Sequence, residues 1–210
     1  MSKSKGSSSE TCNRVMKAAL QLFNERGYSK VTTHDIAKVA DMSPGNLYYH
    51  FANKEEIVRE MFLQMDIFSK EKWFERGPLN PKESFLDFMR FFFGNLSRYQ
   101  FFFREFSLIV QNVPAMRKLW QDRWTNLMGA MRQAVRLWQK AGVLVKFESE
   151  AEIDAFIENS WIIANFSGIH REFISPAHRQ LGADRQLVVR FLYPYHTVKG
   201  QRALDLYLKS

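Results

Sequence analysis

The 210-residue sequence contains few of the residues on which disulfide, metal and catalytic chemistry depend. Its only cysteine, Cys12, excludes an internal disulfide and a zinc site built from several thiolates. The five histidines are scattered, and the H-x-x-x-H, G-x-S-x-G and glycine-rich phosphate-loop motifs do not occur. We therefore expect no enzyme activity, no metal site and no cofactor.

Long apolar runs are missing as well. No segment approaches the ~18–20 apolar residues that cross a bilayer, and the opening MSKSKGSSSE lacks the apolar core of a signal peptide. A single cysteine also suits a reducing compartment. The sequence thus predicts a cytoplasmic protein with no membrane partner, in which residues 1–9 form a disordered arm.

Positive charge is in excess. The formal net charge is +8 and the isoelectric point is about 9.6, which favours a polyanionic partner such as nucleic acid. An anionic membrane surface would satisfy the same balance, so the charge by itself leaves both partners open. The apolar residues, however, are spread around the predicted helices as in a core, which argues against a membrane-surface protein.

The apolar residues recur with the period of a helix, and the two-residue alternation of strands does not occur. The first predicted helix, 10–26, has one apolar face, formed by Val15, Ala18, Ala19, Leu22 and Phe23. Gly77–Pro81 is the strongest break in the chain. Beyond it we predict helices over residues 81–98, 100–112, 114–141, 150–174, 183–197 and 199–208. The sequence therefore predicts an all-α fold.

Three short helices fit into the first fifty residues. After the first helix, threonine hydroxyls can cap a second, which ends at the tight break Asp41–Ser43. Ser43 and Pro44 are typical of the N-cap and first residue of a third helix, which ends near His50. Two helices joined by a three-residue turn form a helix-turn-helix. We therefore place a DNA-binding domain at residues 10–55.

The same segment matches a known pattern at fixed spacing. The matching blocks are Ala18-Ala19-Leu20-x-Leu22-Phe23-x-x-x-Gly27-Tyr28, Thr32-Thr33-x-x-Ile36-Ala37-x-x-Ala40 and Ser43-x-Gly45-x-Leu47-Tyr48-x-His50-Phe51-x-Asn53-Lys54. In these blocks the chain resembles the TetR/AcrR family of bacterial regulators. The family usually has glycine in the turn where this chain has Asp41, a residue that tolerates left-handed backbone better than most. The resemblance implies an N-terminal three-helix helix-turn-helix domain and a C-terminal helical domain for ligand binding and dimerisation.

The predicted third helix has the size of a DNA-reading element. A helix of about two turns fits the major groove, and Pro44 and Gly45 keep its N-terminal end small. The family resemblance assigns phosphate contacts to Thr33, Tyr48 and Lys54, backbone or sugar contacts to Tyr49 and His50, and base contacts to His34, Ser43, Gly45 and Asn46. Pro44 completes the predicted DNA-binding set. Purely structural roles for Tyr48 and His50 are the alternatives.

Phenylalanine is concentrated in the middle of the chain, where twelve of the 19 lie between Phe62 and Phe106. They extend over several faces of their helices, which is typical of a helix that borders a cavity or is buried on several sides. The resemblance assigns residues 56–210 to effector binding and dimerisation. The candidate pocket residues are Phe88, Phe92, Phe103, Arg104, Trp124, Met128, Met131, Trp161 and Asn165. Arg104 would hold an effector carboxylate or form a structural ion pair.

The helices predicted at about 150–174 and 183–197 are, by the family resemblance, the surface of a homodimer. Two of them from each subunit would form a four-helix bundle. The first carries more apolar residues than one helix within a monomer needs.

These features together predict a ligand-responsive repressor. It would bind a palindromic operator in double-stranded DNA as a dimer, and an unidentified hydrophobic or amphipathic small molecule would release it. The alternative is a constitutive DNA-binding regulator or nucleoid-associated protein without an effector. The two differ in whether a small molecule changes both thermal stability and operator affinity.

Overall fold

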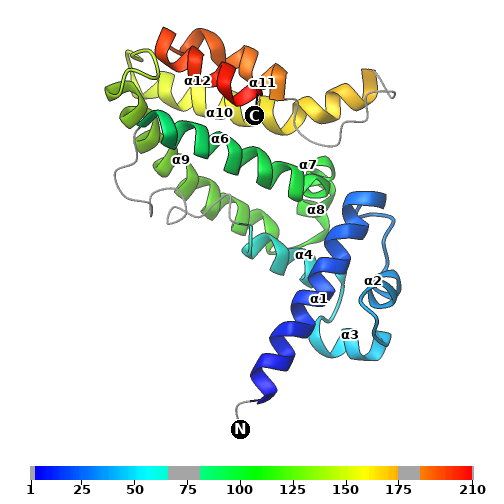
Figure 1. Ribbon diagram of the computed structural model, residues 1–210. Helices are drawn as coiled ribbons and strands as arrows, with labels where there is room; N and C mark the ends of the chain where they lie inside the picture. The colour runs from blue at the N-terminus through cyan, green and yellow to red at the C-terminus, as the bar shows by residue number, and fades with distance from the viewer. Residues whose placement is uncertain (1–2, 66–80, 175–184, 210) are drawn as a thin grey trace. The chain divides into compact units, whose positions relative to one another are not determined.

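The computed structural model describes residues 3–65, 81–174 and 185–209. Apart from one isolated β-bridge, the regular elements in these ranges are helices, so the predicted all-α fold is confirmed. In chain order they are α1 (Lys3–Arg26), α2 (Thr33–Val39), α3 (Pro44–His50), α4 (Lys54–Leu63), α6 (Pro81–Arg98), α7 (Gln100–Arg104), α8 (Phe106–Asn112), α9 (Met116–Lys140), α10 (Glu150–Ile174), α11 (Arg185–Leu192), the 3₁₀ turn η3 (Tyr193–Tyr195) and α12 (Val198–Lys209). Figure 1 shows their course.

The chain divides into two compact units that each combine segments distant in sequence. The first unit consists of Met1–Met65 and Tyr99–Trp120, and the second of Asp66–Arg98 and Gln121–Ser210. The domain boundary predicted from the sequence, between residues 55 and 56, instead separates two consecutive segments of the chain. Helix α9 contributes its first residues to the first unit and the remainder to the second.

In the first unit, α1 packs against α2, α3, α4 and α7. The ring of Phe23 in α1 lies 5.0 Å from that of Phe101 in α7, and Phe62 in α4 stacks on Phe102 at 5.2 Å. Burying an aromatic side chain of this size contributes roughly 1.5–3 kcal/mol. The core of this unit therefore joins the N-terminal helices to α7.

Two helix boundaries differ from the sequence-based expectation. Helix α1 begins at Lys3, although we expected residues 1–9 to be disordered. Once the apolar face has formed a helix, each preceding residue adds a backbone hydrogen bond at little further cost, which explains the extension. The helix expected over 100–112 is divided at Glu105, where φ is −111° and ψ is 26°.

Side-chain caps begin the next three helices. Thr32 and Asp35 form a capping box at the start of α2. Ser43 and Asn53 each accept the backbone N–H of the residue three positions later, at the starts of α3 and α4. Each cap of this kind is worth about 1 kcal/mol. The predicted start of α3 at Pro44 is confirmed.

The turn between α2 and α3 contains Asp41 with a φ of +51°, in the left-handed region. Its N–H donates to the carbonyl oxygen of Lys38 at 3.3 Å, and the N–H of Met42 donates to that of Ala37 at 3.1 Å. These bonds close the end of α2 and require the positive φ. A residue with a Cβ is strained there, because the Cβ approaches the following carbonyl oxygen.

Replacing Asp41 with glycine should stabilise the first unit, because glycine adopts a positive φ without this clash. We expect D41G to raise the free energy of unfolding, measured in urea, by about 0.5–1 kcal/mol. The matched control D41N removes the charge but keeps the Cβ, so it should change stability little. A D41G protein no more stable than the original would contradict the argument.

Helix α6 lies at the centre of the second unit (Figure 1). Its Phe85, Phe92 and Phe93 contact rings from α9, α10 and α12, with centroid distances of 5.1, 5.6 and 5.7 Å. Helix α11 packs against α10 and α12. The helix expected over 183–197 is interrupted by Pro194, since α11 ends at Leu192 and a 3₁₀ turn follows.

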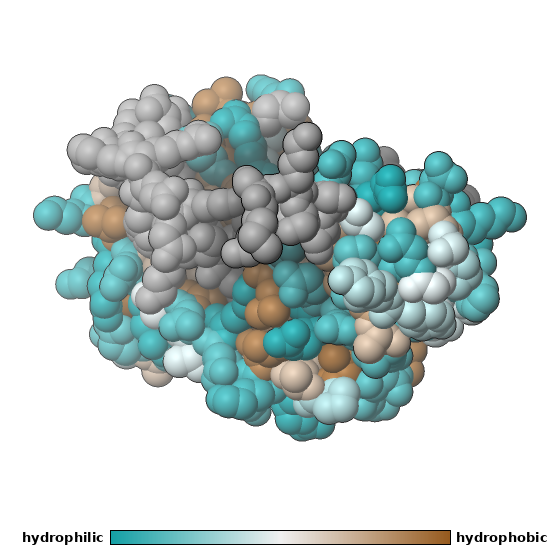
Figure 2. All heavy atoms as spheres, turned by 90° about the horizontal axis from the view of Figure 1, so that it is seen from below, coloured by the Kyte–Doolittle hydropathy of each residue, from teal (hydrophilic) through white to brown (hydrophobic). Residues whose placement is uncertain are grey.

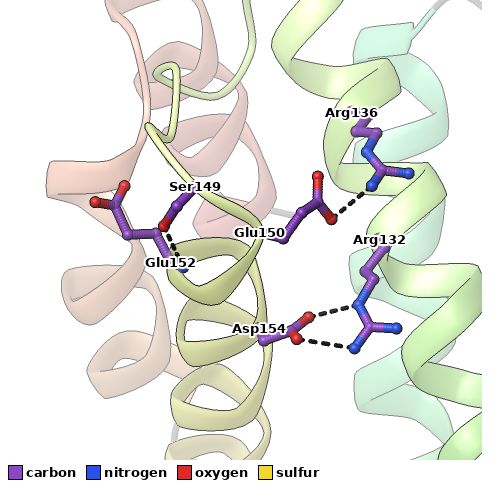
Figure 3. Close-up of polar contacts among 6 residues, drawn as sticks. All are labelled: Arg132, Arg136, Ser149, Glu150, Glu152 and Asp154. Atoms are coloured by element: carbon purple, nitrogen blue, oxygen red, sulfur yellow. Dashed lines mark hydrogen bonds and ion pairs between the residues drawn. The ribbon is translucent and has the colours of Figure 1, made fainter.

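Two ion pairs connect α9 to the first turns of α10 (Figure 3). Arg132 binds both carboxylate oxygens of Asp154, with an Nη2–Oδ2 distance of 2.8 Å, and Arg136 binds Glu150. The guanidinium of Arg132 lowers the pKa of the Asp154 carboxyl. Ser149 caps α10 by accepting a backbone N–H from its first turn. Because a bidentate pair has a defined geometry, these contacts fix the register of the two helices.

The surface shown in Figure 2 is mostly hydrophilic over the described residues, and its hydrophobic residues form small separate groups. In the described part of the chain, no helix is both long enough and apolar enough to cross a bilayer.

His196 is buried between α6 and the turn after α11, with an exposed fraction of 2%. Its Nδ1 donates to the carbonyl oxygen of Leu192 at 2.7 Å, and its ring lies 5.0 Å from that of Phe85. Its Nε2 is buried without a hydrogen-bond partner among the described residues. Because protonation would place a charge in this apolar setting, burial lowers the pKa of His196 from 6.5 to about 4.

This pKa predicts a loss of stability in mild acid. Between about pH 6.5 and pH 4 the unfolded chain binds a proton that the folded chain excludes, so stability falls as the pH decreases through this range. The loss should reach about 2 kcal/mol at pH 5 in urea denaturation. H196L should flatten the pH dependence, whereas H170Q, at an exposed position on α10, should not. Equal slopes in the two variants would overturn this assignment.

Candidate nucleic-acid interface and apolar cavity

Helix α3 is anchored by one residue and presents most of the others to solvent. Leu47 is fully buried beneath it. Asn46 and Gly45 are exposed, and a Cβ at Gly45 would meet no atom within 4 Å. Tyr48 and Tyr49 are 46% and 83% exposed, which is unusual for residues of their size. The helix therefore offers a polar and aromatic face to a partner.

A pair of hydroxyl groups connects α2 to α3. The Oγ1 of Thr33 lies 2.8 Å from the phenolic oxygen of Tyr48, and either atom can be the donor. Since one hydrogen is used in this bond, the other hydroxyl hydrogen remains for an external acceptor. Two predicted phosphate contacts are thus adjacent at the surface.

The other predicted DNA-binding residues surround this pair. His34 is exposed on α2. His50, at the end of α3, is half-buried, with its Nδ1 3.7 Å from the Sγ of Cys12 and its ring 5.1 Å from that of Tyr49. Ser43 is exposed but accepts the capping N–H at 3.2 Å.

Lys54 is more deeply involved in the structure than the sequence suggested. Its Nζ donates to the carbonyl oxygens of Tyr28 at 2.8 Å and Val31 at 2.9 Å, both in the loop between α1 and α2. The ammonium also lies 4.3 Å from the centre of the Tyr28 ring. Partial burial lowers the pKa of Lys54. The side chain thus joins the start of α4 to this loop.

Glu105 also binds the loop between α1 and α2. Its Oε2 accepts the backbone N–H of Ser29 at 3.0 Å. Gly27, with a φ of +88°, leaves room for the carboxylate, with which a Cβ at that position would collide. Nearby, the Oδ1 of Asn24 accepts the backbone N–H of Phe101 at 3.1 Å. No local sequence signal points to Glu105, because its partner lies 76 residues away.

Lys54 should therefore stabilise the fold as well as carry charge. K54M keeps most of the aliphatic stem but leaves two carbonyl oxygens without their charged donor, so we expect the free energy of unfolding to fall by about 1–3 kcal/mol. Urea denaturation measures this change. K38M is the matched control, since Lys38 is exposed on α2 and its loss should cost less than about 0.5 kcal/mol. Equal effects of the two substitutions would exclude a structural role for Lys54.

The second unit contains an apolar cavity of about 60 Å³ between α6, α9, α10 and α11. Among the residues that the structure describes, none that lines it is charged, and its walls are mainly aromatic and aliphatic. The lining residues are Phe85, Phe88, Met89, Phe92, Phe93, Leu127, Met131, Trp138, Phe156, Ile157, Ser160, Trp161, Ala164, Val188 and Leu192. Of the predicted pocket residues, Phe88, Phe92, Met131 and Trp161 line it.

Three predicted pocket residues lie in the second unit without lining the cavity. The ring of Trp124 packs edge-on against Trp161 at 5.3 Å. Met128 is buried. Asn165 is also buried, and its amide donates to the carbonyl oxygen of Trp161 at 2.7 Å.

The remaining two, Phe103 and Arg104, belong to α7 in the first unit and do not line this cavity either. Phe103 packs edge-on against Phe102 at 5.5 Å. Their assignment was based on the concentration of aromatic residues in the middle of the chain, which does not distinguish the core of the first unit from the wall of the cavity.

Apolar side chains remain exposed on the two helices that were expected to form a dimer. Ile162 and Phe166, one turn apart on α10, are 51% and 48% exposed. Leu187, on the adjacent α11, is also exposed. Exposed apolar residues grouped on packed helices are typical of an interaction surface. Within the described ranges, no cluster of three or more His, Cys, Asp or Glu residues could hold a metal ion.

Two family models match the chain. One, described as bacterial regulatory proteins of the tetR family, matches residues 15–61. The other, described as bacterial transcriptional repressor, matches residues 74–204, which is more than half of the chain. The two matches together include α2 to α4 and most of the second unit.

Curated relatives match over a smaller part of the chain. The HTH-type transcriptional regulator QacR of Staphylococcus aureus is 38% identical over 64 residues, which make up 30% of this chain and 32% of the relative. IcaR of Staphylococcus epidermidis, named as a negative transcriptional regulator of the biofilm operon icaADBC, is 42% identical over 48 residues, 23% of this chain and 26% of the relative. The chain thus matches about a third or less of the length of these relatives.

A solved structure matches nearly the whole chain. It is a TetR-family transcriptional regulator from Marinobacter aquaeolei VT8, with a TM-score of 0.76 and 25% identity over 94% of this chain and 97% of that one. The similarity in fold therefore extends well beyond the helix-turn-helix.

Proposed function

The chain belongs to the TetR family of bacterial transcriptional regulators, and on this basis we propose that it is a ligand-responsive repressor that binds a palindromic operator as a homodimer. Its relatives and solved neighbours are DNA-binding transcriptional regulators and not enzymes. The second family model describes bacterial transcriptional repressors and IcaR is a negative regulator, which supports repression as the mode of regulation.

The exposed face of α3 is the observation that carries the proposal. A seven-residue helix with a small N-terminal end enters the major groove without steric conflict. Asn46 then faces the base edges, where its amide can bond to adenine N6 and N7. His34, Ser43 and Gly45 complete the base-reading set, and Pro44 keeps the approach open.

In this proposal, the hydroxyl groups of Thr33 and Tyr48 and the ammonium group of Lys54 supply the phosphate contacts. The hydroxyl hydrogen of Thr33 or Tyr48 that is not used between them would donate to a phosphate oxygen. Lys54 uses two of its three hydrogens on carbonyl oxygens, which leaves one for a phosphate at the positive end of α4. Tyr49 and His50 would contact the sugar-phosphate backbone beside them.

Dimerisation through α10 and α11 would place two such helices on one duplex. The exposed Ile162, Phe166 and Leu187 support this surface, because a partner copy would remove them from water. In a two-fold dimer each residue meets the same surface of its partner. Two half-sites about one helical turn apart, or a multiple of it, would then be read together.

The apolar cavity would receive the effector. Helix α6 forms part of its wall and is followed directly in the chain by α7, whose end carries Glu105. A ligand that displaces α6 would therefore act along the chain on the residue that holds the α1–α2 loop. Regulation would then be a population shift between DNA-binding and released conformations.

Operator binding and its residues can be tested together. Selecting bound fragments from a genomic library identifies an operator, and fluorescence anisotropy then measures affinity across salt concentrations and base substitutions. We expect binding as a dimer that weakens steeply with salt. Y48F should weaken binding about three- to tenfold on all sequences, because it removes the Tyr48 hydroxyl and the hydrogen bond that positions the Thr33 hydroxyl. N46A should relax preference at one base pair in each half-site by about 1–3 kcal/mol.

The control is N126A, at an exposed position on α9 in the second unit, which should leave affinity and sequence preference unchanged. A sequence profile of N46A identical to that of the original protein would remove Asn46 from the base-reading set. Binding that is insensitive to salt would contradict the docking proposal as a whole.

A further inference from the structure

The walls of the cavity offer flat apolar surfaces and no ionic partner. The rings of Phe88 and Phe92 stack at 5.7 Å with an interplanar angle of 26°. Phe88 also packs on Trp138 at 5.4 Å, and Phe92 packs edge-on against Trp161 at 5.6 Å. Aromatic walls at these spacings favour a planar guest that stacks or packs edge-on.

Among the described lining residues, Ser160 carries the one hydroxyl group, and this group already forms a hydrogen bond within the protein. The Oγ of Ser160 donates to the carbonyl oxygen of Phe156 at 2.6 Å. It has no hydrogen left to stabilise an anion, although its lone pairs can accept one hydrogen bond. The cavity therefore provides no donor that a carboxylate would need.

Two arginines close to the lining residues in sequence are paired with carboxylates. Arg132 follows the lining residue Met131 but binds Asp154, and Arg136 binds Glu150 (Figure 3). An ion in the cavity would consequently be buried without a counter-ion, which costs several kcal/mol even after relaxation. A neutral molecule avoids this cost.

The volume limits the size of the guest. A cavity of about 60 Å³ is smaller than the ~150 Å³ space that is known to accept benzene in a protein core. Met89 and Met131 lie in the wall, and their unbranched side chains can change rotamer to enlarge it. An enlarged cavity would then suit a single ring better than a larger guest.

We propose that this cavity binds a neutral planar aromatic molecule with one ring, and that it rejects carboxylates and other ions. The effector role of such a molecule rests on the function proposed above, whereas its binding can be measured without DNA. The inference narrows the hydrophobic or amphipathic class expected from sequence to its uncharged, compact members.

Toluene and benzoate are suitable probes, because they share a ring and differ in charge. Thermal unfolding and tryptophan fluorescence of the full chain would be followed as each is titrated. At ten times its Kd, toluene should raise the Tm by about 3–5 °C. Benzoate should bind at least tenfold more weakly. Equal affinity for the two, or no binding of toluene, would overturn the proposal.

Substitutions in the wall locate the site. A164M places a larger side chain at a buried lining position and should weaken toluene binding at least tenfold, whereas A155M, at an exposed position on the same helix, should leave it unchanged. If A164M does not fold, S160A provides the test. Removing the only wall hydroxyl should leave toluene affinity within about twofold, because no hydrogen bond is required. Unchanged binding in A164M, or a tenfold loss in S160A, would contradict the proposal.

Operator binding separates this inference from the proposed function. If toluene binds the cavity but does not change operator affinity, the ligand class stands and the effector response fails. If benzoate releases DNA equally well in A164M, the response stands and this cavity is not its site.

Discussion

The loop Gly27–Val31, between α1 and α2, is bound by two ions of opposite charge, and the positions of α2 and α3 depend on these contacts. The ammonium of Lys54 binds two carbonyl oxygens of the loop, and the carboxylate of Glu105 accepts one of its amide hydrogens. Each ion thus meets the complementary end of a peptide dipole. Because α2 begins immediately after the loop and α3 follows one tight turn later, a displacement of the loop would move both helices.

The two candidate sites have opposite chemistry, and each suits its proposed partner. The face of α3 is polar and exposed, with one buried anchor at Leu47 and neighbouring hydroxyl and amide groups. Such groups can exchange water for phosphate and base edges at little desolvation cost. The cavity in the second unit is apolar, and none of the described residues in its wall is charged. A guest there would be held by shape and dispersion, whereas the proposed DNA interface would use charge and hydrogen bonds.

The pocket shows where sequence-based reasoning stops. Helical periodicity indicated that the aromatic residues of α6 lie on several faces, and Phe88, Phe92, Met131 and Trp161 do line the cavity. The same reasoning included Phe103, because the aromatic run extends through residues 101–103, but the structure places Phe103 in the first unit. The backbone bends at Glu105, and no residue in that stretch is a helix breaker of the kind that proline or glycine provides.

By itself, the sequence determined the helices, their caps, the tight turn at Asp41 and the short third helix, because these depend on hydrogen bonds and apolar spacing within a few residues. Only the tertiary structure decided that Glu105 meets a loop 76 residues earlier, and that Lys54 binds that loop as well. It also decided which aromatic side chains surround empty space. Such contacts depend on how helices pack and on which rotamers their side chains adopt. Neither can be inferred from residues that are neighbours in the chain.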